Sequence, residues 1–235
     1  MTDPPLALSF FDPARNLSGT ARAGMTLLFA GTKPTTIDSG PDVTRDQGGA
    51  MTARLGDRLD LRFDPIAAAA TLTGLEITLC AVIGTVGASR VDCLGTATRT
   101  TEPPAWAELD VVRGVTAVFG PDRAVFLLAR RPRGAMGHGH ELVEAQLLLD
   151  GELAEVEDAR LSTVYDGDGR QRNAGLELFL PAEDFPRRVS GTVSAGASLS
   201  LEGLRVNAAV FGWQMEGREG TGLYELAVRD DREAA

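Results

Sequence analysis

The chain has 235 residues and a formal net charge of −10 at neutral pH, with 33 acidic residues against 23 basic ones. Hydrophobic residues make up 43% and charged residues 24%, which excludes a disordered chain and is typical of a globular protein. The negative charge would repel nucleic-acid phosphates and anionic lipid headgroups, so we expect no nucleic-acid partner and no membrane-surface role. Two cysteines, Cys80 and Cys93, are too few for a disulfide framework or a zinc ribbon.

The first residues carry no basic cluster and so do not predict a secretory signal. The longest weakly polar stretch, residues 66–86, is interrupted by Glu76 and several threonines, so it does not predict a membrane span. With two thiols that we expect to be reduced, the sequence predicts a cytoplasmic protein without membrane insertion.

Short runs in which hydrophobic and polar residues alternate recur along the chain, and Gly, Asp or Pro bounds most of them. This pattern predicts an all-β fold. The segment 32–49, rich in Gly, Thr, Asp and Pro, predicts a long loop over the mouth of a pocket. The runs before residue 102 are 7–11, 19–29, 50–55, 59–63, 72–83 and 90–98.

Between the halves of the chain, Trp106, Leu109 and Val112 or Arg113 recur at helical spacing after a pair of prolines. This spacing predicts a short linking helix. It divides the chain into an N-terminal β domain, residues 1–102, and a C-terminal β-barrel domain, residues 103–235.

From residue 115 onward about eight further runs follow, enough to close one barrel. The dipeptide Asp150-Gly151 predicts a tight hairpin turn. The clearest run, residues 204–215, leads through a glycine-rich turn into the run 221–228. The sequence therefore predicts two packed β-barrels, or one large β-sandwich built from the same strands.

The two histidines of the chain, His138 and His140, are two residues apart, so in a strand both would face the same side. With Glu144 they form a pattern that resembles the first metal-binding motif of the cupins. Two histidines and a carboxylate would suit a facial triad for iron or a similar metal. Alternatively one histidine acts as a general acid or base without metal, or both only form hydrogen bonds in a glycine-hinged loop.

A wider resemblance covers most of the chain. The segment Phe10-Phe11-Asp12-Pro13-Ala14-Arg15, leading into Leu17-Ser18-Gly19-Thr20, resembles the opening strand of lipocalin-like (calycin) proteins related to carotenoid 1,2-hydratase, the AttH-like group. Residues 213–225 resemble their closing hairpin. The resemblance implies two lipocalin-like barrels with an apolar pocket, and an activity in hydrating isoprenoid double bonds, cyclising polyenes or binding lipids. It places His138 and His140 near the pocket by position and Glu225 by the closing motif, although the Asp and Trp-Gly usual after the histidines are absent.

Hydration of an alkene needs an acid to protonate the double bond and a base to activate water, in a dry pocket. We therefore expect a hydrophobic small-molecule partner and no cofactor. Three hypotheses remain open: a cofactor-free hydratase or cyclase, a non-catalytic binding module, and a metal-dependent cupin-like enzyme. The acid–base candidates are His138, His140, Glu225, Asp110 and Glu141, the ligand-binding candidates are Trp106, Trp213, Tyr165 and Arg113, and the metal ligands of the third hypothesis are His138, His140 and Glu144.

Overall fold

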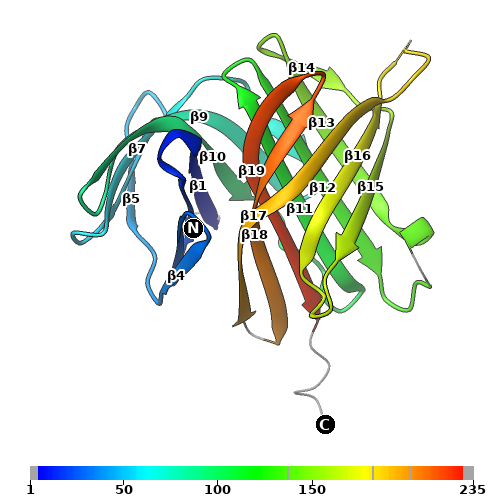
Figure 1. Cartoon of the computed structure of the whole chain (residues 1–235), viewed down its shortest axis with the longest axis horizontal. Helices are drawn as coiled ribbons and strands as arrows, with labels where there is room; N and C mark the ends of the chain where they lie inside the picture. Colours follow the sequence, from blue (N-terminus) through cyan, green and yellow to red (C-terminus); the bar gives the residue numbers. More distant parts are fainter. Residues whose placement is uncertain (1–4, 137, 182, 202, 230–235) are drawn as a thin grey trace.

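The computed structural model describes residues 5–136, 138–181, 183–201 and 203–229, and most of them lie in antiparallel strands (Figure 1). The predicted all-β fold is confirmed. Helical structure in these residues is limited to the single 3-10 turns Pro13–Arg15 and His138–His140. No helix in the described ranges is long and apolar enough to cross a membrane.

The first sheet takes its strands from the N-terminal part of the chain. Its order is β4-β3-β2-β1-β10-β9-β7-β6-β5, with β8 paired to β9 beside this path. The strands are β1 (Leu6–Asp12), β2 (Leu17–Arg22), β3 (Met25–Ala30), β4 (Lys33–Ile37), β5 (Asp42–Arg45), β6 (Met51–Leu55), β7 (Leu59–Pro65), β8 (Ala70–Leu72), β9 (Leu75–Val86) and β10 (Ser89–Thr100).

The second sheet repeats this topology. Its order is β14-β13-β12-β11-β19-β18-β17-β16-β15. Apart from β8, each strand takes the same place as its counterpart in the first sheet, so one meander is folded twice, although the sequence contains no exact repeat. The strands are β11 (Leu109–Gly120), β12 (Arg123–Pro132), β13 (Leu142–Leu149), β14 (Glu152–Glu155), β15 (Asp158–Tyr165), β16 (Gln171–Phe179), β17 (Arg187–Leu201), β18 (Leu204–Met215) and β19 (Arg218–Arg229).

In both sheets the last strand pairs with the first, and a glycine allows their close approach. A Cβ atom on Gly95 of β10 would lie 2.2 Å from the backbone oxygen of Ser9 in β1. A Cβ atom on Gly222 of β19 would lie 1.8 Å from the backbone oxygen of Thr116 in β11. Both distances are far below van der Waals contact, so only glycine fits at either position.

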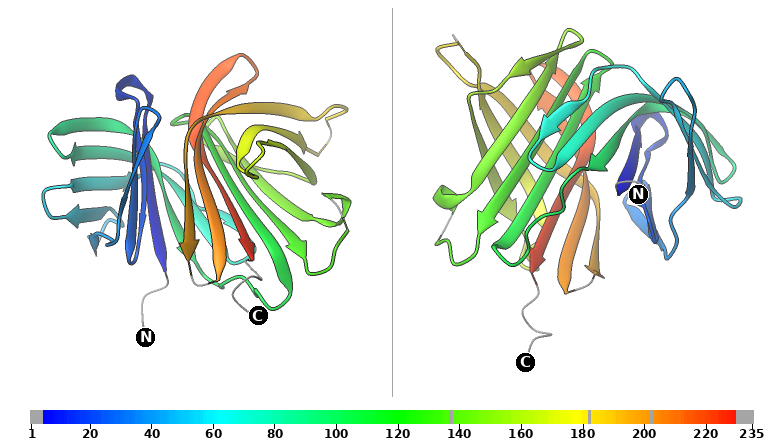
Figure 2. Two further views of the ribbon diagram at one scale, coloured as in Figure 1. Left: turned by 60° about the horizontal axis from the view of Figure 1, so that its bottom comes forward. Right: turned by 180° about the vertical axis from the view of Figure 1, so that it is seen from behind.

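Each sheet curls into a half-barrel, and the two half-barrels meet along their convex faces (Figure 2). Strand β12 illustrates how this packing appears in the sequence. Residues 124–129 of this strand are all buried. Val125 and Leu127 fill the second half-barrel, while Phe126 and Leu128 pack against the first sheet. A strand covered on both faces is a continuous apolar run rather than an alternating one.

The predicted linking helix was wrong. Residues 106–108 form a turn, and β11 begins at Leu109. Val111, Arg113 and Val115 are buried in alternation, and this period of two prevails over the helical spacing because the strand pairs on both sides, with β12 and β19. The strands change from one sheet to the other between residues 100 and 109; the domain boundary at residue 102 stays a prediction.

Two further segments differ from the prediction. The segment 32–49 is not a continuous loop, because it holds β4 and β5 at the two edges of the first sheet. Most residues of these strands are exposed, so they lack the alternation that marks a half-buried strand. The predicted strand 19–29 is a hairpin of β2 and β3, and Gly24 supplies a left-handed φ of 80° at its turn.

Candidate functional site

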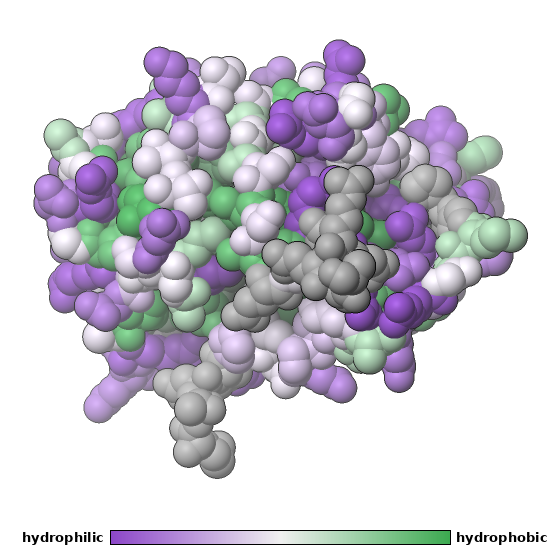
Figure 3. Space-filling model, turned by 90° about the horizontal axis from the view of Figure 1, so that it is seen from below, coloured by the Kyte–Doolittle hydropathy of each residue, from purple (hydrophilic) through white to green (hydrophobic). Residues whose placement is uncertain are grey.

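A pocket of about 460 Å³ opens at the mouth of the first half-barrel. This volume lies in the range of about 300–1,000 Å³ that small-molecule sites occupy. In the view from below, hydrophobic side chains gather over this half of the molecule, with hydrophilic ones around them (Figure 3). Its apolar lining comes mainly from Pro5, Leu6, Leu8, Pro41, Val43 and Met51.

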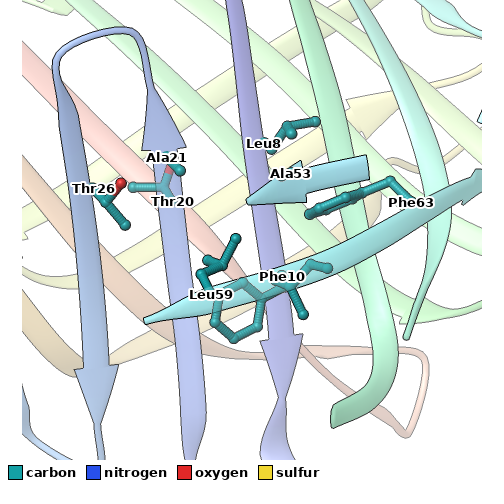
Figure 4. A pocket seen from close by; sticks show the side chains of 9 residues that line it. Leu8, Phe10, Thr20, Ala21, Thr26, Ala53, Leu59 and Phe63 are labelled. Atoms are coloured by element: carbon teal, nitrogen blue, oxygen red, sulfur yellow. The ribbon is translucent and has the colours of Figure 1, made fainter. Parts of the chain in front are cut away.

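Leu8 and Ala21 of this lining also border a deeper cavity inside the same half-barrel. The deeper cavity measures only about 10 Å³, room for about one water molecule. Its walls come from β1, β2, β3, β6 and β7, where Phe10, Leu59 and Phe63 fill the interior (Figure 4). A ligand would therefore occupy the mouth, above a packed interior.

Cross-strand pairing turns two arginines toward this mouth. Residues directly opposite each other on paired strands share a face. Arg99 lies opposite Leu6, and Arg45 lies opposite Met51, so both arginines stand on the concave face with the pocket. The Arg99 guanidinium pairs with Glu76, with its Nε 3.1 Å from the carboxylate. The pocket thus combines an apolar floor with a basic rim.

Glu225, which the resemblance placed near a pocket, lies on β19 and forms an ion pair with Arg22 of β2. Arg22 is one of the residues that line the pocket. The two residues are 203 positions apart in sequence, and the contact of the two convex faces brings them together. Because Arg22 lies opposite Ala7 and not opposite Leu8, its ion pair with Glu225 lies on the convex face of the first sheet, on the other side of the sheet from the concave face.

A second group of polar residues is buried inside the second half-barrel. Arg113 and Glu141 form an ion pair there, and their side chains are 1% and 2% exposed. The Thr163 hydroxyl lies 2.7 Å from the Tyr224 hydroxyl and accepts a hydrogen bond of 3.5 Å from the Arg113 guanidinium. Tyr165 packs beside them. We call these five residues the barrel cluster.

Burial controls the ionisation of the barrel cluster. Desolvation raises the pKa of Tyr224, and Tyr165 adds to this effect while Arg113 opposes it. Desolvation acts against the charge of Arg113, but Tyr224, Tyr165 and Glu141 outweigh it and raise the pKa of Arg113. The cluster thus holds a permanent cation beside a neutral phenol.

The barrel cluster unites Arg113 and Tyr165, two predicted ligand-binding residues, with the acid–base candidate Glu141. Two other predicted residues lie outside it. Asp110 accepts a hydrogen bond of 3.0 Å from the backbone N–H of Gly134. Trp106 is half-buried in the turn before β11, where its backbone oxygen accepts a hydrogen bond from Arg229.

Trp213 lies in the hydrophobic core of the second half-barrel. It is 1% exposed, and its ring stacks on Phe211 with 5.1 Å between the ring centroids. This position is that of a core residue; the ligand-binding role assigned to it from the sequence stays a prediction.

Glu144, the third member of the predicted metal site, connects the two half-barrels. Its carboxylate accepts hydrogen bonds of 2.8 and 2.9 Å from the Thr73 hydroxyl and backbone N–H, and it pairs with Arg130. Burial opposes its charge, but the contacts with Thr73 and Arg130 prevail and lower the pKa of Glu144. Its oxygens are therefore already engaged.

His140 is exposed in the 3-10 turn, and the side chain of His138 lies outside the described residues. Over the ranges that the structure describes, no three His, Cys, Asp or Glu side chains are grouped so as to hold a metal. The turn stands on the far side of the second half-barrel from the first sheet (Figure 1). The metal site stays a prediction without support from the described geometry.

Sequence reasoning missed the arginines of the pocket rim and Thr163 and Tyr224 of the barrel cluster. One signal was present: the segment 32–49 was expected at the mouth of a pocket, and Pro41, Val43 and Arg45 from this segment do line one. The arginines could not be found individually, because strand pairing decides which of them face inward.

No family model matches the chain, and no curated protein matches it. Among solved structures, a candidate AttH protein from Nitrosomonas europaea is similar with a TM-score of 0.63 and 11% identity, over 95% of this chain and 92% of that one. Kievitone hydratase from Nectria haematococca is similar with a TM-score of 0.58 and 11% identity, over 96% and 89%. Each match spans both half-barrels, so the chain has the fold that the resemblance predicted, two lipocalin-like half-barrels packed together.

Proposed function

We propose that this protein binds an apolar small molecule, an isoprenoid, polyketide or lipid, in the pocket of the first half-barrel. The observation that carries the proposal is the pocket itself, about 460 Å³ with an apolar lining that includes Leu6, Val43 and Met51. Burying a hydrophobic ligand against such a concave surface removes apolar area from water on both partners. A structural neighbour named as the hydratase of kievitone supports a small organic ligand.

A charge placed in the pocket wall tests this proposal. Val43 lines the pocket and is 40% exposed, so Val43→Asp introduces a carboxylate there without opening the core. Ile83→Asp is the matched control, because Ile83 is 48% exposed on β9 of the same sheet and does not line the pocket. Retinol, a neutral and fluorescent isoprenoid alcohol, serves as the probe.

We expect wild-type protein and Ile83→Asp to bind retinol alike in fluorescence titration, and Val43→Asp to bind it at least about tenfold more weakly, since covering a charged carboxylate with an apolar ligand is unfavourable. Native mass spectrometry of the purified protein would show whether a hydrophobic molecule is already bound. Equal binding by both variants, or no binding by any protein, would refute the proposed site.

Hydration of the bound molecule is a second candidate function, and the structural neighbour named as kievitone hydratase favours it. The resemblance assigns Glu225 to the acid–base machinery; its carboxylate pairs with Arg22, a residue of the pocket lining, and a carboxylate can activate a water molecule as a general base. The 3-10 turn that holds the two histidines lies on the far side of the second half-barrel from the first sheet (Figure 1), so an acid–base role in this turn would belong to the second half-barrel. Hydration or cyclisation at this pocket would require no cofactor.

Reaction in ¹⁸O-water separates catalysis from binding. A hydratase incorporates one labelled oxygen into an isoprenoid alkene or into kievitone, whereas a cyclase changes retention time without changing mass. Glu225→Gln should abolish labelled product and leave retinol affinity within about twofold. A wild-type protein that binds ligand but forms neither product is a binding module.

A further inference from the structure

We infer that the pocket of the first half-barrel selects an amphiphile with a carboxylate head, and that Arg45 binds this head. The inference rests on the proposed function and adds the substrate class to it. Three arginines, Arg22, Arg45 and Arg99, line an otherwise largely apolar pocket. A fully apolar ligand would use none of them.

The three arginines differ in their partners. Arg22 pairs with Glu225, and Arg99 pairs with Glu76. The Arg45 guanidinium contacts only the sulfur of Met51, at 3.6 Å, and forms no ion pair with any carboxylate of the described residues. A methionine sulfur is a weak acceptor, so the guanidinium has N–H donors available for a ligand at the mouth.

The arginines on the neighbouring strands are paired with carboxylates, which sets Arg45 apart from them. Arg54 on β6 pairs with Asp60, and Arg62 on β7 pairs with both Asp46 and Asp64. In a chain with a net charge of −10, carboxylates are plentiful. The guanidinium of Arg45, on the concave face, is therefore available to bind the anionic group of a ligand. A carboxylate matches its planar donors and forms a charge-assisted hydrogen bond with them.

The lining also gives the ligand a direction. Arg45 belongs to β5 at the edge of the first sheet, while Leu8 and Ala21 lie deeper and border the internal cavity. A carboxylate at Arg45 would therefore place an alkyl chain over Met51 and toward Leu8. The chemical class that fits this pocket is a long-chain monocarboxylate.

Dodecanoate and dodecanol test the inference, because they share a chain and differ in the charged head. Arg90→Gln is the control for Arg45→Gln. Arg90 is also exposed, lies on β10 of the same sheet, and does not line the pocket. It stands nine residues before Arg99 on the same strand, roughly 30 Å away. Isothermal titration calorimetry at pH 7.5 measures both ligands, and thermal unfolding confirms that each variant is folded.

We expect wild-type protein and Arg90→Gln to bind dodecanoate about five- to tenfold more tightly than dodecanol, the scale of one partly exposed charged hydrogen bond. Arg45→Gln should remove this preference and leave dodecanol affinity unchanged. Equal affinity of wild-type protein for the two ligands would overturn the inference and leave the proposed function standing. An equal loss in both variants, or a loss of dodecanol binding in Arg45→Gln, would also overturn it. Binding of neither ligand by the wild-type protein would overturn the proposed function as well.

Discussion

Replacing Glu141 with Gln isolates the energy of the ion pair inside the second half-barrel. The side chains of Arg113 and Glu141 are 1% and 2% exposed, so water screens their interaction very little. An arginine does not lose its proton in a protein, so Glu141→Gln leaves the charge of Arg113 buried without its carboxylate. Removing one member of such a pair costs about 3–5 kcal/mol.

This cost translates into a large thermal shift. In a chain of 235 residues, each 1 kcal/mol lowers Tm by about 2–4 °C, so Glu141→Gln should lower Tm by about 6–20 °C. The double variant Arg113→Met with Glu141→Leu replaces the whole pair by apolar side chains. It should recover most of the loss, because apolar replacement of a buried pair is close to neutral or stabilising.

Urea unfolding at pH 7, followed by circular dichroism, measures these free energies, and constant m-values confirm that the transitions are comparable. Asp60→Asn is the control, because the Arg54–Asp60 pair is 65% and 55% exposed and its loss should cost less than about 1 kcal/mol. A Glu141→Gln loss no larger than this control would refute the reasoning, as would a double variant less stable than Glu141→Gln itself.

Three further predictions concern the sheet contacts and the titrating groups. Gly222→Ala should lower unfolding free energy by about 1–3 kcal/mol or more through its clash with β11, whereas Gly114→Ala, with open space around its Cβ position, should be near neutral; equal values in urea unfolding would contradict this. Burial raises the pKa of both Cys80 and Cys93 from 9.0 to about 12. Iodoacetamide at pH 8 should therefore label the two thiols only in urea. Their contribution to the free energy of unfolding should be complete below pH 9 and be lost as the pH rises toward 12. The pKa of Glu144 is lowered from 4.5, so it stabilises the fold above that pH and less as the pH falls; Glu144→Gln should therefore destabilise at pH 7 and flatten the acid dependence of unfolding, and an unchanged pH profile would exclude this role.

The sequence alone determined the fold class, because strand periodicity and turn dipeptides are local signals. Alternation in residues 204–215 and the turn at Asp150-Gly151 predicted strands and a hairpin that the structure contains. The short motifs at the two ends of the chain indicated the lipocalin-like pairing of two half-barrels. The predicted linking helix was wrong because it rested on only three residues at helical spacing. Pairing of β11 with a strand on each side outweighs such a short pattern.

Only the tertiary structure determined which charged and polar residues lie together. Arg113 and Glu141 are 28 residues apart, and Arg22 and Glu225 are 203 apart, so no local pattern connects them. The period of two tells which residues share a face, but the register of the strands and the curl of each sheet decide what that face meets. Arg45 illustrates this, since its edge strand is too exposed to be recognised, and only its pairing with β6 turns it toward the pocket.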